Sequence, residues 1–173
     1  MLGRRKRVVG LDLGSSVVKA VEITLDGHEP VITAFGRVEI PPGGDVSQAV
    51  AQVFSQGKFK SKRVVAGVAG QSVVARYIPM LKMSDEDLRQ AIRFETDKYV
   101  PFEADDVVMD VQALRKPDGS LVLEGESGGD EQRMRVLLAA CRKQHLQERI
   151  DLIVNQGLTP IGVGLDLFAL ANA

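Results

Sequence analysis

A short turn between two apolar runs constrains this chain more than any other part of its sequence. In the stretch GLDLGSSVVKAVE, Gly14, Ser15 and Ser16 separate an apolar run that contains Asp12 from a second run that contains Lys19. We expect two tightly connected strands whose backbone N–H groups, two hydroxyls and one ammonium are directed at a single point. Successive N–H groups in such a concave turn bind anions, and Mg²⁺ accepts a carboxylate together with water and phosphate. The turn therefore predicts contact with nucleotide phosphates, with Asp12 holding a hydrated Mg²⁺.

This turn differs from the two common glycine-rich phosphate loops. The GxxxxGK[ST] loop and the GxGxxG dinucleotide turn both lead into a helix, whereas an apolar strand follows here. The pattern is similar to the first phosphate loop of the superfamily of actin, sugar kinases and heat-shock chaperones, approximately DxGxxxxK, with Asp12, Gly14 and Lys19 in the matching places. An ordinary hairpin with a Gly-Ser turn is the alternative interpretation of the same residues.

The length and charge of the chain exclude several classes of protein. Its 173 residues suffice for one full domain or for two small lobes. A net charge of −1 gives no overall field for nucleic acid, so we expect no nucleic-acid partner. The sequence holds no apolar run near the roughly 20 residues that span a bilayer, and its basic start leads straight into a strand with no signal-peptide core. The single cysteine, Cys141, lies in an apolar run and suggests a reducing compartment, so we expect a cytoplasmic protein.

Charge is unevenly distributed along the chain. Residues 4–7 are all basic, and residues 81–110 hold nine acidic against four basic side chains. The basic start is open to two interpretations, a solvated terminus or weak attraction to anionic lipid.

The first part of the chain has the pattern of three strands, a helix and two further strands. The third strand is expected over Pro30–Ile40, with Val31, Thr33 and Phe35 on one face and Ile32 and Ala34 on the other. An Asp26-Gly27 turn precedes it, and Asp45 is expected to cap the helix. The run from Val64 to Val68 is nearly all apolar, as in a strand covered on both faces. This order is the core order of a ribonuclease-H-like lobe.

A second part begins with Ser84, which suits the start of a helix. That helix is expected to end at Val100, because Pro101 disfavours the helical conformation in the residue before it. Further on, a strand is expected over Arg133–Cys141 and a helix up to a stop at Gly157. We therefore expect three parts, over residues 1–82, 83–165 and 166–173. The last looks like the beginning of a helix, so we interpret the chain as the front part of a larger protein.

Three segments together carry a specific resemblance. The chain resembles the PilM family, actin-like cytoplasmic components of type IV pilus assembly related to the cell-division protein FtsA. The segments that carry this resemblance are GLDLGSSVVKAVEI, LKMSDEDLRQAIRFETDKYVPFEADDVVMDVQAL and GLTPIGVGLDLFALANA. The resemblance implies an α/β fold with mixed sheets, namely the first lobe of an actin-like protein with a small inserted subdomain.

The resemblance also implies partners and cofactors. It implies a scaffold, peripheral to the inner membrane, that docks the cytoplasmic tail of PilN in a groove between lobe and subdomain and links it to the pilus motor ATPase. Contact with the membrane would then be indirect. Family members bind ATP with Mg²⁺, which implies phosphate contact at Asp12, Gly14, Ser15, Ser16 and Lys19. Because the second phosphate loop and the adenosine pocket belong to a later half, we expect this chain to bind ATP weakly or not at all.

Aromatic residues of the acidic second part are candidates for partner contact. Tyr99 and Phe102 are core residues in the simplest interpretation, whereas Phe94 lies off the apolar stripe of its helix, which then packs on two sides or exposes an aromatic side chain. Beside acidic side chains, however, they also suit an extended partner segment with apolar side chains and a basic rim.

Other functions fit the sequence less well. A sugar-kinase-like phosphotransferase needs a general base near its acceptor hydroxyl, and the acids after Met80 form no recognisable catalytic group. An FtsA-like protein or a docking component of type II secretion is a further alternative, against which the helix ending in YVPF argues. We therefore expect no catalytic residue and no enzyme.

Overall fold

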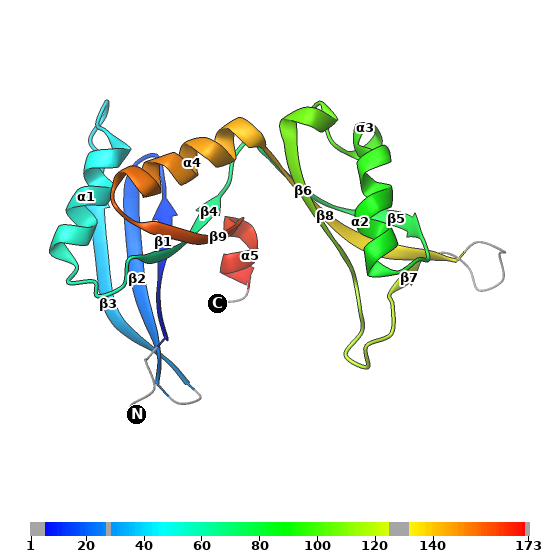
Figure 1. The fold of residues 1–173 in the computed structure, drawn as a ribbon, viewed down its shortest axis with the longest axis horizontal. Coiled ribbons are helices and arrows are strands. Elements are labelled where there is room, and N and C mark those ends of the chain that lie inside the picture. The colour runs from blue at the N-terminus through cyan, green and yellow to red at the C-terminus, as the bar shows by residue number, and fades with distance from the viewer. Residues whose placement is uncertain (1–5, 27–28, 125–131, 172–173) are drawn as a thin grey trace. The chain divides into compact units, whose positions relative to one another are not determined.

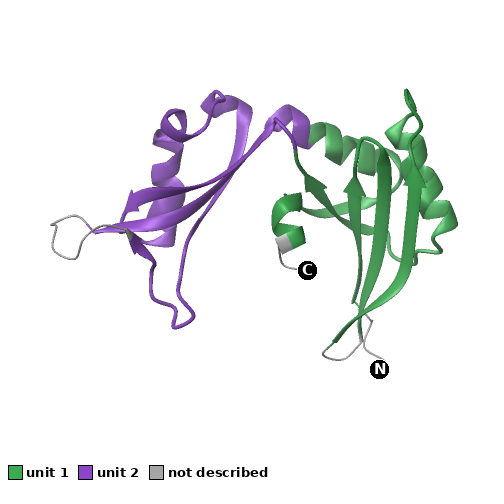
Figure 2. Ribbon diagram, turned by 180° about the vertical axis from the view of Figure 1, so that it is seen from behind, with its two compact units in different colours: residues 1–69, 147–173 green, residues 70–146 purple. Residues whose placement is uncertain are grey.

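A computed structural model describes residues 6–26, 29–124 and 132–171 of the chain. The chain divides into two compact units, and each is described here by itself (Figure 2). Unit 1 comprises residues 1–69 and 147–173, and unit 2 comprises residues 70–146. Among the described residues, no helix is long and apolar enough to cross a membrane.

Unit 1 is built on a five-stranded mixed sheet (Figure 1). Its strands are β1 (Lys6–Leu13), β2 (Val17–Asp26), β3 (Glu29–Glu39), β4 (Arg63–Val68) and β9 (Thr159–Leu165). They lie in the order β3-β2-β1-β4-β9, with β1 to β3 antiparallel and β4 parallel to both β1 and β9. Three antiparallel strands followed by a crossover to a parallel strand confirm the α/β class and the ribonuclease-H-like order predicted from the sequence.

Helices cover one face of this sheet. They are α1 (Val46–Gln56) and α4 (Lys143–Asn155), while the short α5 (Asp166–Ala171) follows β9. Asp45 caps α1 by accepting a hydrogen bond of 2.8 Å from the Ser47 N–H, and Gly157, at φ +68°, follows the end of α4, both as predicted. The shared core consists of alternate strand residues and helix residues: Val9, Leu11, Leu13, Val18, Ala20, Val64, Ala66, Ala49, Val50, Val53 and Ile153.

Two expectations about the faces of this sheet were wrong. Val65 is exposed, so β4 is not covered on both faces in this chain. The expected alternation along β3 fails because the β2–β3 register shifts between Glu22 and Ile23, which places Ile32 opposite Ile23 and Phe35 opposite Val21. Directly paired residues share a face, so Ile32 and Phe35 lie on the same side of the sheet.

A buried carboxylate in β2 holds the connector that leads from α1 to β4. Glu22 is only 1% exposed. Its Oε2 accepts hydrogen bonds of 2.7 and 2.8 Å from the backbone N–H groups of Lys60 and Ser61, and its Oε1 accepts one of 2.7 Å from the Thr33 hydroxyl. Burial alone would raise the pKa of Glu22, but these hydrogen bonds and the charge of Arg7 bring that pKa below its usual value.

Unit 2 is a smaller antiparallel sheet with helices on one face. Its elements are β5 (Val73–Leu81), α2 (Asp85–Phe94), α3 (Thr96–Tyr99), the 3-10 helix η1 (Ala104–Asp106), β6 (Val107–Ala113), β7 (Leu123–Glu124) and β8 (Arg133–Arg142). The strand order is β5-β8-β6, and β7 pairs with the beginning of β8. Leu88 and Ile92 of α2 pack with Val111, Met134 and Leu138 in its core.

The helix expected from Ser84 to Val100 is interrupted at Glu95. Ser84 caps it as predicted, by accepting a hydrogen bond of 3.1 Å from the Asp87 N–H. The hydroxyl of Thr96 lies 3.1 Å from the carbonyl oxygens of both Ile92 and Arg93 and shares its hydrogen between them, which helps to satisfy the end of α2 before the one-turn α3.

The boundaries of the two units differ from those of the three expected parts. The strand β5 pairs with β8 and so belongs to unit 2, whereas β9 pairs with β4 and returns the end of the chain to unit 1. The residue pattern of a strand does not reveal which strand it pairs with, which is why sequence alone assigned β5 to the first part and β9 to the second. The expected Asp26-Gly27 turn lies partly outside the described residues.

Because the carboxylate of Glu22 is hydrogen-bonded in its charged form, we expect the free energy of unfolding to depend on pH. The substitution Glu22→Gln should lower the free energy of unfolding at neutral pH by about 2 kcal/mol, because hydrogen bonds to a charged group are lost. A lowered pKa in the folded state gives stability above the unfolded pKa, near 4.5, that is lost as the pH falls below it. Urea unfolding at neutral and acid pH should therefore show a smaller pH dependence in the variant.

The exposed Glu29 of β3 supplies the matched control. Glu29→Gln should change the free energy of unfolding little at either pH. Equal pH dependence in the wild type and in Glu22→Gln would contradict the role of Glu22.

Candidate functional site

The antiparallel register of β1 and β2 brings the two charged residues of the predicted phosphate turn together. Asp12 lies directly opposite Lys19, and Lys19 Nζ is 2.9 Å from Asp12 Oδ2. Their neighbours Leu11 and Ala20 are buried, so the charged pair lies on the opposite face of the sheet. Both side chains are about half exposed and can accept a further ligand.

The turn itself depends on a close backbone approach at Gly14. A Cβ atom there would lie 2.6 Å from the carbonyl oxygen of Val17, closer than any side chain tolerates. Ser15 and Ser16 are exposed at the tip, and the Ser16 carbonyl accepts a hydrogen bond of 2.8 Å from the Ile40 N–H. Gly14 is therefore needed for the shape of the turn, and the segment after β3 holds it in place.

Two residues that the sequence did not single out complete this end of the sheet. Arg149 of α4 donates a hydrogen bond of 2.7 Å from Nη1 to the carbonyl of Leu13, the last residue of β1. Asp166 opens α5, and its carboxyl oxygen occupies the space that a side chain at position 67 would fill, so Gly67 is required there. Burial raises the pKa of Asp166, and the charge of Asp12 raises it further, while Arg149 opposes both.

A signal for one of these two residues was available. Asp166 follows an apolar strand directly, as functional acids at strand ends do. The bond of Arg149 goes to a backbone carbonyl far away in the chain, and no residue pattern marks such a partner.

These residues fit one side of a phosphate and Mg²⁺ site. Lys19 supplies an ammonium, Gly14 to Ser16 supply a tight turn, and Asp12 supplies a carboxylate. Among the described residues no three His, Cys, Asp or Glu side chains come together as a metal centre. A cation here would therefore keep water and phosphate oxygens as most of its ligands, which is how Mg²⁺ usually binds beside a nucleotide.

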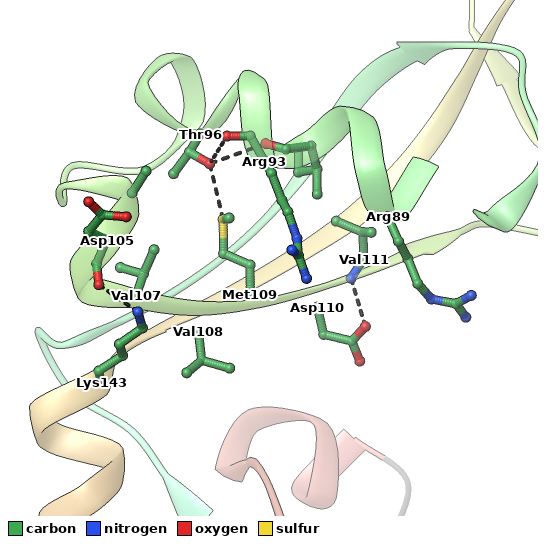
Figure 3. Close-up of a pocket in the computed structure, with 12 residues that line it drawn as sticks. Arg89, Arg93, Thr96, Asp105, Val107, Val108, Met109, Asp110, Val111 and Lys143 are labelled. Carbon is green, nitrogen blue, oxygen red and sulfur yellow. Dashed lines mark hydrogen bonds between the residues drawn. The ribbon is translucent and has the colours of Figure 1, made fainter. Parts of the chain in front are cut away.

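Unit 2 carries a hollow of about 500 Å³ along β6, which we call the edge hollow (Figure 3). It is lined by residues of α2, α3, η1, β6 and the start of α4: Arg89, Ile92, Arg93, Thr96, Ala104, Asp105, Val107, Val108, Met109, Asp110, Val111 and Lys143. Lys143 Nζ donates a hydrogen bond of 2.6 Å to the carbonyl of Asp105, which joins α4 to η1. The exposed Arg89 and Arg93, one helical turn apart on α2, add positive charge to one wall.

Within the part of the chain that the structure describes, the edge hollow runs along a strand edge that no other strand pairs with. In the strand order of unit 2, β6 is an end strand whose pairing is with β8. Leu114 donates its N–H to Arg135 across that pairing, so the N–H groups of Met109 and Val111 point away from β8. Val111 donates its N–H at 2.9 Å to the side chain of Asp110. An extended segment could therefore add to this edge as a further strand.

The three aromatic residues proposed from the sequence do not form one surface. Phe94 is 89% exposed at the end of α2. Tyr99 and Phe102 are partly buried against the core of unit 2, and the guanidinium carbon of Arg142 lies 4.5 Å from the centre of the Phe102 ring. Phe102 also lines a second, more acidic hollow of about 470 Å³, together with Asp97, Val100, Pro101, Glu103, Asp106 and Arg142.

Comparison with known proteins gives a family and a fold. The family described as type IV pilus assembly protein PilM matches residues 10–173. Among solved structures, a chain of the PilM-PilN type IV pilus biogenesis complex has a TM-score of 0.77 at 24% identity. The match covers 96% of this chain and 49% of that chain. The cytoplasmic domain of EpsL, an inner membrane component of the type II secretion system of Vibrio cholerae, has a TM-score of 0.60 at 14% identity. The match covers 95% of this chain and 59% of that domain. At these identities the likeness shows the fold, and this chain spans about half the length of the first structure.

The close backbone approach at Gly14 predicts that alanine is destabilising there and tolerated at Gly10. Gly14→Ala should lower the free energy of unfolding by about 2 kcal/mol, because the added methyl group must displace the Val17 carbonyl. Gly10→Ala is the control, since its Cβ would lie 4.0 Å from the nearest atom, the Val21 carbonyl oxygen. Urea unfolding of both variants measures the difference, and equal stability of the two would show that the turn does not need glycine.

Proposed function

This chain belongs to the PilM family of type IV pilus assembly proteins, and on that premise we propose that it is a scaffold that docks the cytoplasmic tail of PilN. The family match over residues 10–173 carries the proposal, and it covers unit 2 as well as unit 1. A fold likeness over 96% of the chain to part of the PilM-PilN complex supports it. In this role the protein lies at the cytoplasmic side of the inner membrane and connects PilN to the motor ATPase.

We place the PilN contact on unit 2, along the edge hollow. An extended peptide gains main-chain hydrogen bonds from an open strand edge and specificity from the side chains around it. The edge of β6 offers the first, the main-chain bonds, through the outward N–H of Met109, and through that of Val111 once it leaves the Asp110 side chain. The half-exposed Val108 and the arginines Arg89 and Arg93 offer the second.

The aromatic residues keep a place in this proposal. Phe102 lies beside η1, which also borders the edge hollow, so it can contact the end of a peptide bound along β6. Tyr99, like Phe102, is partly buried against the core of unit 2. Phe94 is exposed on α2 but lines neither hollow, so its contact would need a segment that extends beyond the strand edge.

The phosphate turn has a second, regulatory role in the proposal. Lys19, Ser15 and Ser16 would contact phosphate, and Asp12 would hold a hydrated Mg²⁺, which screens the phosphate charge. Lys19 and Asp12 are already paired and half exposed, so they provide one wall of such a site. The chain spans about half of the matched PilM-PilN complex chain, and the opposite wall would come from a later half.

The family match favours docking over the alternatives drawn from the sequence. A sugar-kinase-like phosphotransferase has no support in the family match. For a type II secretion component, the likeness to EpsL at 14% identity concerns the fold. We therefore propose a binding role without catalysis.

Peptide titration tests the place of the PilN contact. A synthetic copy of the cytoplasmic tail of PilN from the same organism should bind this chain in isothermal titration. Val108→Asp should weaken that binding at least about tenfold, since a buried unpaired charge in the hollow costs more than 1.4 kcal/mol. Leu123→Asp is the matched control, because Leu123 is 45% and Val108 is 46% exposed and both lie in unit 2.

Alanine substitutions test the aromatic residues separately. Phe102→Ala should lower the affinity for the peptide, and so should Phe94→Ala if the tail extends beyond β6. Unchanged affinity in both variants would remove these residues from the contact. Equal losses in Val108→Asp and Leu123→Asp would contradict the edge hollow as the docking site.

Nucleotide titration tests the phosphate turn. This chain should bind Mg-ATP weakly or not at all, because each missing charge-assisted hydrogen bond from a second phosphate loop removes about 1.5–3 kcal/mol. Peptide binding should accordingly be the same with and without Mg-ATP. Micromolar affinity for Mg-ATP that is lost in Lys19→Met would show instead that this half holds a complete site.

A further inference from the structure

Basic side chains from two distant segments gather at one end of the unit 1 sheet. Because β1 and β4 are parallel, both begin at this end, where Lys6 opens β1 and Arg63 opens β4. The Ser61 hydroxyl donates to the Arg7 carbonyl at 3.2 Å, and the Thr159 N–H donates to the Lys62 carbonyl at 2.7 Å. These bonds hold the connector against the sheet. We call the exposed bases Lys6, Lys60, Lys62 and Arg63 the basic end.

Little acidic charge opposes the basic end. Among the described side chains of these strand ends, the acids are Glu22 and Glu29. Glu22 is buried, and its carboxylate is occupied by Lys60, Ser61 and Thr33. Glu29 is exposed at the start of β3. The four bases outnumber the acids of these strand ends, Glu22, Asp26 and Glu29, so this end has a net positive charge, although the whole chain carries −1.

Exposed apolar side chains lie on β2, the neighbour of β1 at this end of the sheet, and on β3 beyond it, and one of them is paired directly with a base. Leu25 of β2 is paired with Lys6 and is 47% exposed, and Ile32 of β3 is 69% exposed. The register shift in β3 places Ile32 and Phe35 on the face of their partners Ile23 and Val21, which is also the face of Leu25. Val31, opposite Thr24, is exposed at the same end of the hairpin.

We propose that this end of unit 1 is a surface for direct contact with an anionic lipid bilayer. Basic side chains are attracted to the negative charge of such a surface, and exposed apolar side chains beside them enter the region between headgroups and acyl chains. A nucleic acid would use the bases but not the apolar side chains. The proposed PilN contact lies on unit 2, so this proposal is independent of it and predicts membrane contact without PilN.

Vesicle flotation of the full chain tests the proposal. The probes are vesicles of phosphatidylcholine alone and of phosphatidylcholine with an equal amount of phosphatidylglycerol. The chain should float with the anionic vesicles and not with the neutral ones, and added salt should reduce the binding. The triple variant Lys60→Gln, Lys62→Gln, Arg63→Gln should bind the anionic vesicles about a hundredfold more weakly, since each basic residue near the surface contributes about fivefold.

A matched triple variant on unit 2 distinguishes vesicle binding by the basic end from attraction by the net charge of the whole chain. Arg76→Gln, Lys82→Gln, Lys116→Gln removes the same charge from exposed positions and should leave flotation unchanged. Ile32→Ser should weaken flotation with no loss of fold, because Ile32 is mostly exposed; circular dichroism on heating checks the fold of every variant.

Three results would overturn the proposal. They are equal flotation with neutral and anionic vesicles, equal losses in the two triple variants, and a dimer in size-exclusion chromatography that Ile32→Ser converts to a monomer. The last result would show that a second copy of the chain covers the apolar strands.

Discussion

The close approach of Gly14 to the carbonyl of Val17 sets the arrangement on which the rest of unit 1 depends. It joins β1 to β2 through three residues and so fixes a register in which Asp12 faces Lys19 on one side, while Leu11 and Ala20 face the core on the other. Arg149 then ties α4 to the end of β1, and Ile40 ties the segment after β3 to the turn. A single glycine thereby links the core of the sheet to the side where a phosphate would bind.

Unit 2 uses its sheet differently. It leaves the edge of β6 unpaired within the described chain and surrounds that edge with helices whose side chains form a hollow. The two units therefore suit two tasks, a charged turn for an anion and an open strand edge for a peptide. In the proposed function the peptide contact uses a surface that lies wholly on unit 2, whereas the nucleotide contact would need a second wall beyond the Gly14 turn.

The sequence predicted those parts of the structure that depend on local chemistry. Capping by Asp45 and Ser84, the stop at Gly157, the Gly14 turn and the succession of β1, β2, β3, α1 and β4 along the chain all follow from patterns within a few residues. The predictions were wrong where the structure of a segment depends on a strand far away in the sequence. The register shift between β2 and β3 turns Ile32 and Phe35 to one face, and the pairing of β5 with β8 and of β9 with β4 decides to which unit each strand belongs. Asp166 had a weak signal as an acid after an apolar strand, and Arg149 had none because its partner is a backbone carbonyl. The edge hollow also depends on which strand ends the sheet, and residue patterns do not reveal that.

The central claim is that an extended segment of PilN adds to the open edge of unit 2. Amide hydrogen exchange, measured on the full chain with and without a saturating PilN-tail peptide, tests it most directly because it reports on backbone N–H groups. The account predicts slower exchange within β6, above all at Met109, with smaller changes in α2 and none in β3. Slower exchange confined to the Gly14 turn and its flanking strands, or no change at β6 despite bound peptide, would contradict it.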